Sequence, residues 1–123
     1  KSPMQQTVEA FTRKRHGAFA ADLMTASEMS DTLRNGEMFF KESMYADARW
    51  FTPTRLGTLL RGMPGCLNLR ACKGRANTRL WAVRDSARYK AMTQTQLYDA
   101  YTEQADAAKQ TAIQQLKVIE GGK

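Results

Sequence analysis

The spacing of apolar residues in the middle of the chain predicts a short amphipathic helix over residues 53–62. Four apolar residues recur at the i, i+3, i+4 and i+7 positions of one helix face: Leu56, Leu59, Leu60 and Met63. Thr52 supplies the hydroxyl that a helix N-cap needs, and Pro53 suits the first helical position because its φ is already fixed. Pro64 and Gly65 end the pattern.

The period changes to two directly after this helix, which predicts a β-hairpin. Apolar and polar residues alternate over residues 67–72, as in a strand with one buried face. A second strand is expected over residues 78–84, where Leu80, Trp81 and Val83 lie. Residues 73–77 contain Gly74 and are predicted to form the loop between the two strands.

The N-terminal part of the chain is predicted to be helical. A first helix is expected over residues 5–15, with a basic last turn that suits the helix dipole and Gly17 as the C-cap. Residues 18–24 are apolar and either extend this helix or start a new one. Thr25 and Glu28 have the T-x-x-E spacing of a capping box and open a further helix that ends near Asn35.

The longest predicted helix occupies the C-terminal end. Thr93 and Gln96 form a T-x-x-Q capping box, and no Pro or Gly follows until Gly121. Its apolar and small residues follow a seven-residue repeat: Tyr98, Ala105, Ala112 and Ile119, with Tyr101, Ala108 and Gln115 three positions behind and Leu97, Ile113 and Leu116 beside them. The helix either packs back on the core or pairs with its copy in a homodimer through residues 93–120, and we favour the homodimer.

These elements predict a mainly α fold with a small antiparallel β-hairpin. The length suits one domain, which we place at residues 1–90, followed by a C-terminal helix at residues 91–123 for packing or dimerisation.

Charge adds the feature that points to a function. The chain has a net charge of +7, but residues 49–90 carry ten Lys and Arg against Asp85 alone, whereas both flanks are slightly acidic. Eight of the ten are Arg, whose planar guanidinium can make paired hydrogen bonds to phosphates and guanine edges. A basic excess concentrated in this way predicts a surface that binds a polyanion.

The same residues give little support to catalysis, cofactors or metals. His16 is the only histidine, and Cys66 and Cys72 do not form a C-x-x-C motif, so no zinc site is expected. We expect a surface histidine and half-buried cysteines. The carboxylates are scattered, and no G-x-x-x-x-G-K-[ST] motif occurs. Tyr89 beside Arg84 lacks the wider set of groups that a tyrosine nucleophile needs. The chain is therefore predicted not to be an enzyme and to hold no cofactor.

Localisation follows from similar observations. Two cysteines do not make a disulfide framework in a chain of this length, which favours a reducing, cytoplasmic setting. The apolar runs are too short to cross a membrane, so no membrane partner is expected. The first residues lack the basic start and apolar stretch of a signal peptide.

The segment WFTPTRLGTLLRGMPGCLNLRACKGRANTRLWAV, about a quarter of the chain, resembles the recognition helix and wing of small bacterial and phage winged-helix regulators. In that family a helix leads into a strand, and a wing rich in Lys, Arg and Gly returns on a strand with an aromatic residue, as Trp81 is here. The resemblance implies a winged-helix-like domain over residues 1–90 and duplex DNA as the partner.

A DNA-binding surface follows from the helix and the hairpin. Thr54, Thr58 and Arg61 would face the major groove, with Arg61 or Arg55 reading bases. The hairpin tip would reach a minor groove or its phosphates. The predicted DNA-binding residues are Thr52, Thr54, Arg55, Thr58, Arg61, Arg70, Lys73, Gly74, Arg75, Asn77 and Arg79.

One part of this assignment has two solutions. The two helices of a helix-turn-helix are joined by three or four residues, whereas a longer stretch, residues 37–50, precedes the Thr52 cap. Either that stretch is an inserted helix, or it is itself the helix that supports residues 53–62 and the Thr25 helix belongs to an N-terminal bundle. We favour the second interpretation.

The predicted function is sequence-preferring binding of duplex DNA, as a transcriptional regulator or a replication or partition accessory. One alternative is a protein-interaction or inhibitor module that docks on an acidic partner. Another is RNA binding. Among the aromatic residues only Tyr89 lies among basic ones as in single-strand binders, which favours duplex DNA.

Overall fold

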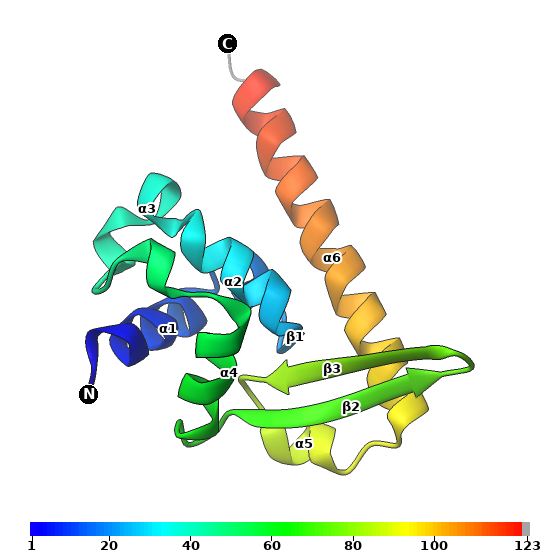
Figure 1. Ribbon diagram of the computed structural model, residues 1–123. Coiled ribbons are helices and arrows are strands. Elements are labelled where there is room, and N and C mark those ends of the chain that lie inside the picture. Colours follow the sequence, from blue (N-terminus) through cyan, green and yellow to red (C-terminus); the bar gives the residue numbers. More distant parts are fainter. Residues whose placement is uncertain (122–123) are drawn as a thin grey trace.

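The structure is a computed structural model that describes the backbone of residues 1–121 and the side chains of residues 1–107. It is mainly helical, with a small antiparallel sheet and a long C-terminal helix (Figure 1). The coarse fold class predicted from the sequence is therefore confirmed. The bounds of the main helices are α1 Pro3–Lys14, α2 Ala26–Arg34, α4 Pro53–Arg61 and α6 Gln94–Gly121.

Shorter elements connect these helices. They are the 3₁₀ turn η1 (Gly17–Ala20), the helix α3 (Gly36–Phe39), the 3₁₀ turns η2 (Lys41–Ser43) and η3 (Ala48–Trp50), and the helix α5 (Ser86–Lys90). The strands are β1 (Leu23–Met24), β2 (Leu67–Lys73) and β3 (Ala76–Ala82), and all pairings in the sheet are antiparallel in the order β1-β3-β2.

All three predicted N-terminal caps are confirmed, and at the start of α6 Gln96 N donates to Thr93 Oγ1 while Thr93 N donates to Gln96 Oε1. Thr25 accepts a hydrogen bond from Glu28 N while Glu28 accepts one from Thr25 N, which completes the capping box of α2. Thr52 accepts a hydrogen bond from Arg55 N at the start of α4, and Pro53 occupies the first turn. α4 already ends at Arg61, before Pro64.

The first helix ends differently from the prediction. Arg15, not Gly17, is the C-cap, because it adopts a left-handed φ of 55° that directs its N–H back to the last turn of α1. Gly17 instead begins η1 and lies against Thr32, where a Cβ would come within 2.6 Å of Thr32 Cγ2. The close approach of η1 to Thr32 of α2 therefore explains why position 17 holds a residue without a side chain.

The residues after η1 form a strand that the sequence did not reveal. Leu23 pairs with Ala82 and Met24 with Trp81, so β1 becomes one edge of the sheet. A strand of two residues shows no periodicity, and its partner lies far along the chain. Neither helical alternative for residues 18–24 is correct beyond the short η1 turn.

The preferred interpretation of residues 37–50 is wrong. α2 supports α4: Met29 and Leu33 share one buried core with Leu56 and Leu60, and Ser30 Oγ donates to Phe51 O over 2.6 Å. Residues 37–50 form only the end of α3 and two 3₁₀ turns, inserted between the two packed helices. The roughly helical spacing of apolar residues in this stretch misled because three of its members are exposed: Met38, Phe39 and Tyr45.

The hairpin has the predicted alternation but a tighter turn. Strands β2 and β3 extend to Lys73 and from Ala76, so the expected loop of residues 73–77 is reduced to Gly74 and Arg75. Gly74 has φ +60°, which suits the first position of a two-residue type II′ turn. The second strand consequently starts and ends two residues earlier than predicted.

Two apolar clusters cover opposite faces of the sheet. On one face, Trp81 and Val83 pack with the helical core of α1, α2 and α4. On the other, Leu80 and Ala82 pack with Tyr89 of α5 and Leu97 of α6. β3 is therefore buried on both sides at its C-terminal end.

The first part of α6 packs back on the domain, one of the two uses predicted for this helix. Leu97 is buried, Tyr98 packs on the cluster around Leu80, and Tyr101 OH donates to Glu28 Oε1 over 2.9 Å. Figure 1 shows α6 continuing beyond the other helices. The later positions of its repeat lie outside the residues whose side chains are described: Ala108, Ala112, Ile113, Gln115, Leu116 and Ile119.

Candidate nucleic-acid interface

The face of α4 opposite its buried stripe is open to solvent. Thr54, Arg55, Thr58 and Arg61 are all exposed. The Thr58 hydroxyl donates to Thr54 O over 3.3 Å, so it points back along its own helix. Arg55 lies over the ring of Trp50, with 5.8 Å from Cζ to the ring centroid. Arg61, in the last turn, makes no ion pair within the described part of the chain.

Thr52 is held in a structural role. Its hydroxyl accepts the N–H of Arg55, and the residue is half-buried. The hydroxyl is therefore occupied by the helix cap.

The centre of the hairpin presents two arginines side by side. Arg70 and Arg79 are Cα partners in the β2–β3 register, both are exposed, and both project from the face opposite Leu80 and α6. Like charges directly opposite on neighbouring strands repel each other. No carboxylate pairs with either guanidinium among the described residues. An anion bound between the two guanidiniums would relieve their repulsion.

The residues around this arginine pair extend the same face. Asn77 lies opposite Cys72, and its amide oxygen is 3.5 Å from the Cys72 thiol. Trp81, further along β3, is buried against the helical core and closes the face at its inner end. Both cysteines are half-buried, as expected, and burial raises the pKa of the Cys66 thiol.

The tip separates Arg75 from Lys73. Arg75 and Gly74 form the exposed turn. Lys73 alternates to the other face of the sheet, where its Nζ lies 2.7 Å from Asp99 Oδ1 on α6. The hydrogen bond and charge of Asp99 raise the pKa of Lys73. The structure thus places Arg70 and Arg79 side by side on one face, Arg75 in the exposed turn, and Lys73 on the other face beside α6.

Two further basic residues from the charged stretch are engaged within the protein. Arg49 forms a two-point ion pair with Asp47, and its hydrogen bonds lower the pKa of Asp47 to about 2. Arg84 is directed inward and forms an ion pair with Asp22. The chain contains no Asp or Glu over residues 49–84, so the remaining arginines of α4 and the hairpin have no acid close to them in sequence.

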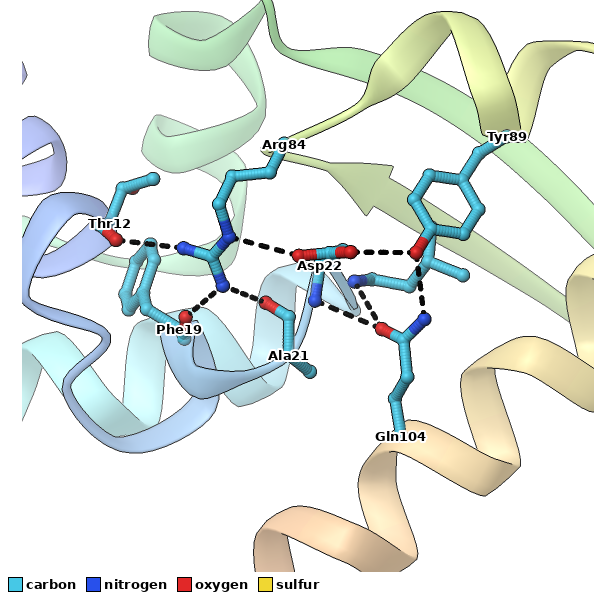
Figure 2. Close-up of polar contacts among 8 residues, drawn as sticks. Thr12, Phe19, Ala21, Asp22, Arg84, Tyr89 and Gln104 are labelled. Atoms are coloured by element: carbon cyan, nitrogen blue, oxygen red, sulfur yellow. Dashed lines mark hydrogen bonds and ion pairs between the residues drawn. The ribbon is translucent and has the colours of Figure 1, made fainter.

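Arg84 is the centre of a hydrogen-bond network that the sequence did not reveal (Figure 2). Its Nε donates to Asp22 Oδ1 over 2.9 Å, Nη1 donates to Thr12 O over 2.7 Å, and Nη2 donates to the carbonyls of Phe19 and Ala21. One guanidinium therefore donates to backbone carbonyls and a carboxylate that lie between the end of α1 and the start of β1.

The network continues to α5 and α6. Tyr89 OH donates to Asp22 Oδ2 over 2.7 Å, and Gln104 Nε2 donates to Tyr89 OH over 2.9 Å. Gln104 Oε1 accepts the backbone N–H groups of Asp22 and Leu23 (Figure 2). Burial alone would raise the pKa of Asp22, but the hydrogen bonds from Tyr89 and Arg84 outweigh it and hold that pKa below its usual value. Burial and the bond to Asp22 raise the pKa of Tyr89.

His16 differs from its expected surface position. Its ring is half-buried and stacks on Phe40, with centroids 3.9 Å apart, and burial lowers its pKa. Within the described residues, no three His, Cys, Asp or Glu side chains are arranged to hold a metal ion. Over the same part of the chain, no helix has both the length and the apolar character needed to cross a membrane.

Comparison with known proteins adds no assignment to this geometry. No protein-family model matches the sequence, and neither the curated proteins nor the solved structures include a significant match.

Proposed function

We propose that the chain is a winged-helix-type protein that binds duplex DNA, with α4 in the major groove and the β2–β3 hairpin along the phosphate backbone. The observation that carries this proposal is the arginine pair Arg70 and Arg79, exposed on one face and without a carboxylate partner in the described residues. Arg61 on α4 and Arg75 at the tip are likewise exposed and have no carboxylate partner among the described residues.

The order of elements supports the assignment. α2 packs on α4, and α4 is followed directly by the hairpin of a three-stranded sheet. The insertion of residues 37–50 lengthens the connection between the two helices but leaves their packing intact, since Ser30 still bonds to Phe51 directly before α4. Regulation of transcription, or a replication or partition role, follows as the proposed use of such binding.

Phosphate contacts would supply most of the affinity, because each neutralised phosphate releases a counterion. If about six phosphates are contacted, affinity should fall roughly a thousandfold between 50 and 200 mM salt. Arg61 and Arg55 would read bases in the major groove, where guanine offers two acceptors to one guanidinium.

The test is a binding assay with equimolar labelled duplex DNA, single-stranded DNA and hairpin RNA, repeated across a salt series. The proposal expects preference for the duplex and steep salt dependence, and the double variant Arg70→Ala, Arg79→Ala should bind at least tenfold more weakly because two charged contacts are lost. The double variant Arg13→Ala, Lys14→Ala, which removes two exposed charges from α1, is the matched control. Binding that does not change with salt, or preference for RNA, would overturn the proposal.

The C-terminal helix has a proposed role in a homodimer. Tyr98 and Tyr101 are used within the chain, since Tyr98 packs on the sheet cluster and Tyr101 bonds to Glu28. The part of the repeat beyond these residues is therefore the segment proposed to pair with a second copy, which would place two basic surfaces on neighbouring half-sites. Sedimentation equilibrium of the full chain and of a chain ending at Ala107 measures this directly.

A further inference from the structure

A cavity of about 280 Å³ lies behind the Asp22 network, on a different part of the surface from the arginine pair of the hairpin. Its walls come from segments far apart in sequence: Arg15 after α1, Asp22 before β1, Arg88 and Tyr89 on α5, and Gln104 on α6. This volume lies just below the range for drug-sized ligands, roughly 300–1,000 Å³, and therefore suits only a small molecule.

The charge around the cavity favours an anion. Asp22 contributes the carboxylate, but Arg84 lies 2.9 Å from one of its oxygens and Tyr89 OH 2.7 Å from the other, so its charge is already compensated. Arg15 and Arg88 are exposed, and neither has an ion-pair partner within 4 Å among residues whose side chains are described. The Arg88 guanidinium lies 5.3 Å from the centroid of the Tyr89 ring, at the wall of the cavity.

One of the two cavity arginines, Arg15, has a left-handed backbone conformation that a residue with a Cβ rarely adopts. Over residues 1–121, only two residues other than glycine have positive φ, Arg15 at 55° and Asp85 at 50°. Arg15 lines the cavity itself. Asp85 is the N-cap residue directly before α5, and its backbone carbonyl accepts the N–H of Arg88. The left-handed region is unfavourable for residues with a Cβ, and such strain occurs preferentially at binding sites.

We propose that this cavity binds a small anion bearing a carboxylate or phosphate group, held between the guanidiniums of Arg15 and Arg88. Guanidiniums form paired, charge-assisted hydrogen bonds with both groups. Because Gln104 forms one wall and also accepts the backbone N–H groups of Asp22 and Leu23 at the start of β1, a bound anion lies at the contact between α6 and the rest of the domain. The site is separate from the proposed DNA surface, and each can fail without the other.

The test is a titration of the full ¹⁵N-labelled chain with sodium phosphate and, separately, with disodium succinate, at an ionic strength held constant with NaCl. Saturable shifts of the Arg15, Asp22 and Arg88 amides support the proposal, and the anion that produces them identifies the preferred group. Arg88→Gln should weaken binding about tenfold or more because a charge-assisted bond is lost. Lys90→Ala, an exposed residue of the same helix outside the cavity, should bind as the parent does.

Arg15→Gly separates binding from folding. Glycine adopts positive φ readily, so the melting temperature should not fall, whereas anion binding should weaken about tenfold. Chemical shifts that rise linearly with the concentration of either anion, without saturation, would overturn the proposal. Binding as tight in Arg15→Gly and Arg88→Gln as in the parent chain would overturn it too. Shifts at Arg15 and Arg88 produced by a short DNA duplex and by neither small anion would overturn it in favour of a nucleic-acid contact.

Discussion

Lys73 at the end of β2 and Asp99 on α6 form an ion pair of 2.7 Å that joins the hairpin to the C-terminal helix. It is the one contact by which an acidic side chain engages the hairpin, within the residues that the structure describes. The pair therefore reduces the positive charge that the hairpin offers to a polyanion.

Asp99→Asn should increase affinity for duplex DNA. The change removes the partner that holds Lys73 on the α6 face, so this long side chain at the end of β2 can turn toward a phosphate at the hairpin tip, and the slope of log affinity against log salt should steepen by about 0.9. Fluorescence anisotropy over a salt series measures both quantities. Glu103→Gln removes the same charge from an exposed position of α6 that makes no ion pair in the described structure, and should raise affinity less. Equal effects of the two variants would show that only net charge matters.

Arg61→Ala and Arg75→Ala should affect binding differently. Arg61 lies on the exposed face of α4 and is expected to read bases, so its loss should cost about 1–3 kcal/mol on the preferred site and less on unrelated duplexes. Arg75 lies in the hairpin turn and is expected to contact phosphate, so its loss should weaken all sequences alike. A selected-site library followed by titration measures both, and the opposite pattern would exchange the two roles.

The ion pair of Asp22 with Arg84 predicts how stability depends on pH. Because the pKa of Asp22 is lower in the folded chain than in the unfolded one, its contribution is complete above the unfolded value, about 3.9, and is lost as pH falls through the folded value. Asp22→Asn should remove this acid-dependent part. At neutral pH it should destabilise the fold by about 2–3 kcal/mol, below the 3–5 typical of a fully buried pair, since both side chains are about 20% exposed.

Urea unfolding at pH 3 and pH 7 measures both effects. Asp47→Asn is the control, since Asp47 also has a low pKa but lies exposed beside Arg49. It should change stability at pH 7 only slightly. An unchanged pH profile in Asp22→Asn would contradict the assigned role of the network.

Gly36→Ala and Gly57→Ala should shift stability in opposite directions. A Cβ on Gly36 would lie 2.6 Å from Phe11 Cζ in the core, so Ala there should destabilise by about 1–3 kcal/mol. Gly57 lies inside α4 with no atom within 4 Å of such a Cβ, so Ala should stabilise by about 0.5–1 kcal/mol. Thermal melts of both variants provide the comparison, and a stable Gly36→Ala variant would show that Phe11 can move aside.

The features predicted correctly from the sequence depend on local interactions. The caps at Thr25 and Thr52 act over three residues, and the alternation of residues 67–72 reflects one buried face. What was missed depends on contacts between distant parts of the chain. Strand β1 exists through its pairing with β3, and Arg84, counted with the basic surface, is drawn inward by Asp22 and by carbonyls of residues 12–21.

The same distinction applies to the candidate site. Charge counting located the basic stretch, but it gave Lys73 and Arg70 the same role although strand alternation sends them to opposite faces. The exposed positions of Arg61, Arg70, Arg75 and Arg79 agree with the predicted surface, while their contact with DNA remains a prediction.

The hydrogen bonds from Asp22 and Leu23 to Gln104 also determine how the sheet ends. β1 is an edge strand, and an unprotected edge can recruit a strand from another molecule and start aggregation. Gln104 of α6 accepts the N–H of Leu23 in β1, a group that such a strand would otherwise bind. α6 therefore blocks pairing of another strand at this edge. The opposite edge, β2, carries Arg70 and Lys73, and positive charge on an edge strand discourages the same association. A variant that detaches α6 should therefore become prone to aggregation as well as less stable.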